Sequence, residues 1–106
     1  MVRDEPLPPG VPKSTLRFYL DDNADAFADF DAVSTALWQP DRTVRLVGMK
    51  GELTRPLLRD LLRLLQAKGV ELIHAKRAGK HSLPLGRLLP NGDTELVVAD
   101  LVKRFL

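Results

Sequence analysis

Residues 54–68, TRPLLRDLLRLLQAK, have the clearest pattern in the sequence, with an apolar strand pattern on each side of them. At about 100° per residue, its leucines fill one side of a helix and its arginines occupy the other. We therefore expect an amphipathic helix over 54–68 that lies on a core. Gly69 follows the last lysine, at the position where a left-handed residue commonly ends a helix.

The two flanking stretches both predict strands. Residues 43–49 (TVRLVGM) are almost continuously apolar, which is typical of a central strand covered on both faces. Residues 70–76 (VELIHAK) have the pattern of a further strand, and we expect His74 to be a hydrogen-bonded residue of the sheet. A strand, a helix and a strand in this order favour a parallel pair with a right-handed crossover.

The residues before this unit predict one more strand and one more helix. Residues 15–20 alternate apolar and polar side chains, which indicates a half-buried strand. Over residues 24–38 the apolar side chains recur near a helical spacing, at Phe27, Phe30, Val33 and Leu37. Pro40 would stop such a helix. We therefore expect a helix over 24–38.

The C-terminal part predicts a hairpin and a short helix. Pro90-Asn91-Gly92-Asp93 is a reverse-turn sequence, because asparagine and glycine accept the positive φ angles of a tight hairpin. The turn joins residues 83–89 to a strand over 94–99. Asp100 is placed to cap a last short helix.

Together these elements predict one small α/β domain. Its core is β-α-β-α-β with a mostly parallel sheet, to which the C-terminal hairpin and the terminal helix are added. A ferredoxin-like α+β arrangement is the alternative. With 106 residues the chain has little room for a second core, so we assign residues 14–106 to a single domain. Residues 1–13 contain four prolines, and we expect a proline-rich extended arm there.

The composition excludes several classes of site. The chain has no cysteine, so disulfides, thiolate metal sites and cysteine nucleophiles are impossible. No cofactor or metal motif is complete, and no serine has the context of a nucleophile elbow, so we predict no cofactor, no metal and a non-catalytic protein. No apolar run reaches the roughly 20 residues of a membrane span, and we expect a cytoplasmic protein without a membrane partner.

Charge is sharply separated along the chain. Residues 20–41 hold six aspartates and no lysine or arginine, whereas residues 42–87 hold eleven basic residues and three acidic ones. The formal net charge is only +2, so the pattern is segregation and not general basicity. Such a polarised surface suits oriented contacts with another protein. The basic residues that we expect on this interaction surface are Arg55, Arg59, Arg63, Lys76, Arg77, Lys80 and Arg87.

The first functional hypothesis is therefore a non-catalytic interaction or assembly module. It would bind another protein chain, or further copies of itself, through the polarised surface and the proline-rich arm. An alternative is nucleic-acid backbone binding by Arg55, Arg59 and Arg63, which recur every four residues along one helix face. This alternative is less favoured, because no base-stacking aromatic residues accompany these arginines.

A further alternative is binding of a phosphorylated ligand, of the nucleotide or coenzyme A type, at the turn from Gly48 to Thr54. Gly48, Lys50, Gly51 and Thr54 offer two glycines, a lysine and a helix start, which are the physical parts of a phosphate cradle. A strand, a glycine-bearing loop and a helix in this order are similar in layout to acetyltransferases of the coenzyme A binding superfamily. The R/Q-x-x-G-x-G/A signature of that superfamily is absent from the chain.

Overall fold

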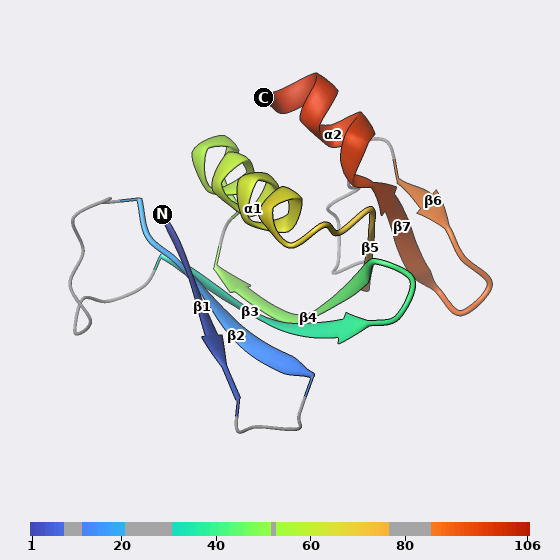
Figure 1. The fold of residues 1–106 in the computed structure, drawn as a ribbon, viewed down its shortest axis with the longest axis horizontal. Helices are drawn as coiled ribbons and strands as arrows, with labels where there is room; N and C mark the ends of the chain where they lie inside the picture. Colours follow the sequence, from blue (N-terminus) through green and yellow to red (C-terminus); the bar gives the residue numbers. More distant parts are fainter. Residues whose placement is uncertain (8–11, 21–30, 52, 77–85) are drawn as a thin grey trace.

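A computed structural model describes residues 1–7, 12–20, 31–51, 53–76 and 86–106. In this part of the chain the strands form one sheet, and both helices lie on the same side of it (Figure 1). The strands are β1 (Val2–Pro6), β2 (Lys13–Phe18), β3 (Ala32–Gln39), β4 (Thr43–Gly51), β5 (Leu72–Lys76), β6 (Arg87–Leu88) and β7 (Asp93–Val97), and the helices are α1 (Arg55–Ala67) and α2 (Val98–Phe105).

The sheet is mostly antiparallel, so the predicted, mostly parallel sheet is wrong. The strand order is β1-β2-β3-β4-β5-β7-β6, and only β4 and β5 run parallel, joined by α1. All other neighbouring pairs are antiparallel. The protein is thus a small α+β domain. It also differs from the ferredoxin-like alternative, which alternates as β-α-β-β-α-β, because four strands precede α1 here.

The error has one physical source, the predicted helix over 24–38. The second half of that segment, together with residue 39, forms β3. In this strand Ala32, Ser34 and Ala36 are buried, and the residues between them are half-buried. Burial thus alternates with the period of two that a strand requires. In the sequence, the larger apolar residues show a wider spacing that resembles a helix and hides this alternation. Because residues 32–39 form a strand, β2, β3 and β4 follow one another as antiparallel neighbours. Residues 24–30 lie outside the described part of the chain.

The N-terminal residues belong to the sheet. Where we expected an extended arm, Val2–Pro6 are extended as β1, and each of these residues has a partner on β2. Asp4 forms an ion pair with Lys68 at the end of α1, with 2.8 Å between Oδ2 and Nζ. β1 is therefore the edge strand beside α1, and it packs on both β2 and the helix.

The core lies between the helices and the sheet. The predicted amphipathic helix is confirmed as α1, and Leu57, Leu61, Leu62 and Leu65 are each at most 1% exposed. They pack in one cluster with Leu16 and Phe18 of β2 and with apolar residues of the other strands. The helix ends as the sequence predicts, since Gly69 has a φ angle of +72°.

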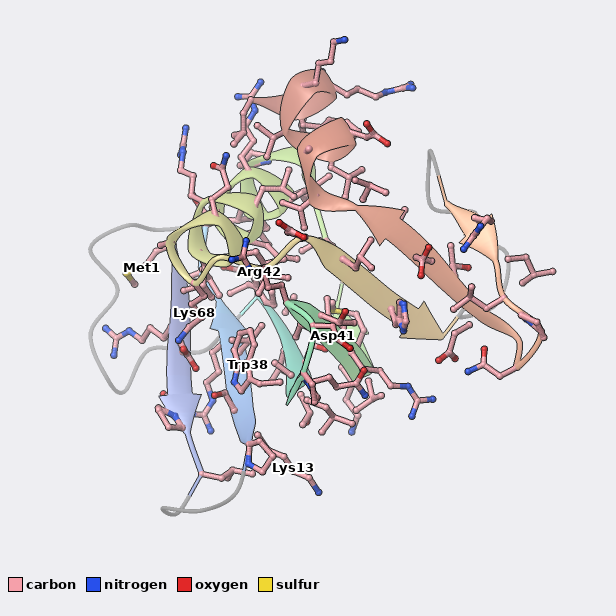
Figure 2. All side chains as sticks on the ribbon, turned by 45° about the vertical axis from the view of Figure 1, so that its right-hand side comes forward. Met1, Lys13, Trp38, Asp41, Arg42 and Lys68 are labelled. Carbon is pink, nitrogen blue, oxygen red and sulfur yellow. The ribbon has the colours of Figure 1, made fainter. Side chains whose placement is uncertain are left out.

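The turn between β3 and β4 holds the start of β5 in place. Asp41 and Arg42 have φ angles of 63° and 56°, which non-glycine residues seldom adopt. The Arg42 carbonyl accepts hydrogen bonds from the amides of Glu71 and Leu72, at 2.8 and 3.2 Å. Figure 2 shows this turn together with Trp38 and Lys68, whose ammonium lies 5.0 Å from the centre of the indole ring. The strands predicted over 43–49 and 70–76 correspond to β4 and β5, which form the expected parallel pair.

Candidate anion-binding site

The turn proposed to bind an anion begins with a β-bulge in β4. Thr35 pairs with Val47 and Val33 pairs with Lys50, so Gly48 and Met49 together face Ser34. Gly48 has a φ angle of +64°, as a glycine bulge requires. The Ser34 hydroxyl donates a hydrogen bond to the Val47 carbonyl at 3.0 Å. This carbonyl therefore has a hydrogen-bond partner at the point where the bulge interrupts the pairing of the strands. A Cβ at Gly48 would meet no atom within 4 Å, so the space beside this residue is open.

Gly51 closes the strand at a crowded point. Its φ angle is +87°, and a Cβ there would lie 2.4 Å from the Asp31 carbonyl oxygen and 2.9 Å from the Ala32 Cα. Only glycine fits such a close approach of two backbones. Gly51 is therefore needed for the fold, whereas Gly48 is free of neighbours.

The turn leads directly into the N-terminus of α1. The first helical hydrogen bond runs from the Leu58 amide to the Thr54 carbonyl, at 2.8 Å. Thr54 makes no side-chain cap, and its hydroxyl is buried without a partner among the described residues. The amides of Arg55 and Leu57 have no intrahelical partner, and Pro56 has no amide hydrogen. The helix start thus has two backbone donors without intrahelical partners, beside a buried hydroxyl that has no partner among the described residues.

The turn also lies at the carboxyl end of the one parallel pair. β4 and β5 pair from Thr43–Leu72 to Leu46–Ala75, and β4 then continues to Gly51 alongside β3. Open sheets place ligands outside the carboxyl ends of parallel strands, where a helix begins. Lys50 is exposed at this end of β4, and as the register partner of Val33 it places a positive charge on the sheet face opposite the helices. The four predicted residues, Gly48, Lys50, Gly51 and Thr54, thus lie within one strand end and the helix start that follows it.

The arginine ridge, which is Arg55, Arg59 and Arg63, lies on α1 as predicted but has partners within the chain. The Arg55 guanidinium lies 5.7 Å from the ring centre of Phe105. The Arg59 Nε donates to the Phe105 carbonyl at 2.9 Å. Arg63 lies 3.7 Å from the Asp60 carboxylate, and a hollow of about 180 Å³ adjoins Arg59 and Arg63. The ridge therefore helps to hold α2 against α1.

The other residues of the predicted interaction surface are not all in one place. Lys76 ends β5, and Arg77 and Lys80 lie outside the described residues. Arg87 is in β6, at the far edge of the sheet from β1. Arg87 pairs in register with Glu95, whose side chain is on the sheet face opposite the helices. The structure therefore does not bring Arg87 together with the arginine ridge.

Sequence reasoning missed a polar cluster on that helix-free face. Arg45 Nε donates to Asp93 Oδ2 at 3.1 Å, reaching from β4 across β5 to β7. His74 Nε2 lies 2.9 Å from Glu95 Oε2, and Arg87 donates to Glu95 Oε1 at 2.9 Å. Residues from β4, β5, β6 and β7 come together here only through the strand order. In the sequence, only the alternation of polar residues in these strands could have indicated this cluster.

Glu95 is the electrostatic centre of this cluster. The hydrogen bond from His74 is the main cause that holds the pKa of Glu95 below its ordinary value of 4.5, and the charge of Arg87 acts in the same direction. Partial burial acts in the opposite direction but does not prevail. Glu95 is therefore ionised at neutral pH.

Among the described residues, no three His, Asp or Glu side chains gather as a metal site would require. No helix in the described ranges is long and apolar enough to cross a membrane.

Comparison of the chain with protein-family models, with curated proteins and with solved structures finds no match in any of the three. The geometry of the chain itself therefore carries the functional argument.

Proposed function

We propose that the protein binds a phosphorylated ligand, of the nucleotide or coenzyme A type, at Gly48, Lys50, Gly51 and Thr54. The observation that carries this proposal is the uncapped start of α1 a few residues after the glycine bulge of β4, where the buried Thr54 hydroxyl has no partner among the described residues. Phosphate oxygens accept hydrogen bonds from such backbone amides and hydroxyls. Lys50 supports the same ligand class through its charge.

The layout of the elements also favours this ligand class. The order of elements is β4, the glycine-bearing turn, α1 and the parallel strand β5. This order is similar to that of acetyltransferases of the coenzyme A binding superfamily. The open space beside Gly48 would allow a ligand to approach the backbone. We also propose a cytoplasmic location, since a chain without cysteine fits a reducing compartment.

The test is a thermal-shift titration with coenzyme A, ADP and inorganic pyrophosphate. A ligand at about 100 times its Kd stabilises the folded state by about 2.7 kcal/mol, which raises the Tm by roughly 10 °C for a domain of this size. We expect Lys50→Gln to weaken binding by about tenfold, because a charge-assisted hydrogen bond is lost. Lys13→Gln, which removes another exposed strand-end lysine, is the control. No stabilisation by any of the three compounds would overturn the proposal.

A second candidate function is assembly with another protein chain or with further copies of this one. The observation in its favour is the sheet face opposite the helices, which no described helix covers and which carries the half-buried side chains of Val33, Leu37 and Val47. Sedimentation of the chain over a wide concentration range tests self-assembly. We expect Leu37→Lys to shift the equilibrium toward the monomer, and a wild-type protein that is monomeric at every concentration would contradict self-assembly.

A further inference from the structure

The helix-free face of the sheet carries one row of charged and polar side chains. Arg45 pairs in register with His74, His74 with Glu95, and Glu95 with Arg87. Residues that pair directly across neighbouring strands point to the same face. The row therefore runs over β4, β5, β7 and β6, at a different place from the turn between β4 and α1.

Three members of the row form a hydrogen-bonded chain. Arg87 donates to one oxygen of Glu95, and His74 Nε2 lies 2.9 Å from the other oxygen. Glu95 is ionised, since its pKa is lowered, so it can only accept hydrogen bonds. The proton of a neutral His74 must then be on Nε2, and Nδ1 carries the lone pair.

The second nitrogen of His74 is available for a ligand. Nδ1 makes no hydrogen bond to any residue in the described ranges, and the His74 side chain is 23% exposed. The Glu95 side chain is 19% exposed, so its charge is partly shielded from water. A partly shielded carboxylate that accepts the Nε2 hydrogen increases the electron density at Nδ1.

Arg45 adds a fixed cation to the same face. Its Nε is held by Asp93 at 3.1 Å, and its two terminal amino groups have no partner among the described residues. Asp93 is itself held by Asn91, whose side-chain oxygen accepts the Asp93 amide at 3.0 Å. The row thus offers a proton acceptor on β5 and free guanidinium donors on β4.

We propose that His74 Nδ1 is a nucleophilic, proton-accepting site, oriented and activated by Glu95, which Arg87 holds in place, on the helix-free face of the sheet. The ligand class that fits is a small molecule with a hydroxyl or amino group next to an anionic group. The hydroxyl or amino group donates to Nδ1, and the anionic oxygens bind the terminal amino groups of Arg45. This site is independent of the proposed phosphorylated ligand at Gly48 to Thr54.

The charged groups that face His74 in the described structure are Glu95 and Asp93 of β7, Arg87 of β6 and Arg45 of β4. Replacing Glu95 alone removes the acceptor that fixes the imidazole and leaves the rest of the row in place, so the Glu95→Gln variant isolates the activating contact.

The test is the rate at which diethyl pyrocarbonate modifies His74 at mildly alkaline pH, with peptide mapping to identify the modified residue. Nδ1 attacks one carbonyl, the carbethoxy group forms a new N–C bond, and ethyl carbonate leaves and decomposes to ethanol and carbon dioxide. The Nε2 proton passes to Glu95 or to water. His81, the only other histidine of the chain, serves as the internal reference.

We expect His74 to react at least as fast as a free histidine derivative, despite its partial burial, and Glu95→Gln to lower the rate by about three- to tenfold. Glu71→Gln is the matched control, because Glu71 pairs with Arg42 and does not contact His74. An unchanged rate in folded Glu95→Gln would overturn the proposal. If that variant does not fold, the imidazole nitrogen shifts of the wild type decide, since a proton on Nδ1 contradicts the proposal.

Discussion

Two glycines with positive φ angles form the turn from β4 to α1, and their surroundings differ. A side chain at Gly48 would extend into open space, whereas one at Gly51 would collide with the backbone of Asp31 and Ala32. Sequence alone identified both glycines as parts of a possible cradle. It could not separate their roles, because the contact between Gly51 and residues 31–32 depends on the pairing of β3 with β4.

This difference predicts unequal costs of substitution. Gly48→Ala should lower the free energy of unfolding by about 1–2 kcal/mol, which is the cost of a left-handed conformation for an L-residue. Gly51→Ala should cost clearly more, because the same strain is joined by a backbone collision. Urea unfolding of both variants measures the difference. Equal destabilisation would show that the close approach at Gly51 is absent.

The hydrogen bonds of Glu95 make the stability of the fold depend on pH. Because the pKa of Glu95 is lower in the folded protein than the ordinary 4.5, its ionised form stabilises the fold above about pH 4.5. That contribution is lost as the pH falls from 4.5 through the lower folded value. The difference in unfolding free energy between wild type and Glu95→Gln should therefore be larger at neutral pH than at about pH 3. A difference that grows on acidification would contradict the assigned hydrogen bonds.

At the scale of an element, α1 connects the candidate site to the core. Its strong amphipathic pattern made it predictable, together with the strands on either side. The strand β3 was not predictable from the same reasoning, because Phe27, Phe30, Val33 and Leu37 mimic a helical spacing while alternating alanines and a serine fill the buried positions of the strand. Small buried residues are a weak signal in a sequence. Only pairing with β2 and β4 reveals that they are covered.

The core face of α1 should respond strongly to truncation. Leu61 is 1% exposed, so Leu61→Ala should reduce the unfolding free energy by about 2–5 kcal/mol. Leu64 on the same helix is only half-buried, and Leu64→Ala should cost less. Chemical denaturation of the two variants provides the comparison. Similar losses would mean that α1 packs on the sheet through a different face.

At the scale of the whole molecule, one misassigned helix changed the predicted fold class. Because residues 32–39 form β3, the strands β1 to β4 make an antiparallel sheet, and β4 with β5 is the one parallel pair among the described strands. The charge segregation seen in the sequence is likewise modified, because the arginine ridge is engaged with Phe105 and Asp60 and Arg87 is engaged with Glu95. The polar row on the helix-free face depends on strand order, which local sequence patterns do not contain.

Binding of a phosphorylated ligand at the turn from β4 to α1 can be followed by a nuclear magnetic resonance titration of the chain with coenzyme A and with inorganic pyrophosphate. We expect saturable shifts of the Gly48, Lys50, Gly51 and Thr54 amides, with weaker affinity in Lys50→Gln and unchanged affinity in Lys13→Gln. Absence of saturable shifts, or shifts confined to Arg59 and Arg63 that disappear with added salt, would contradict it.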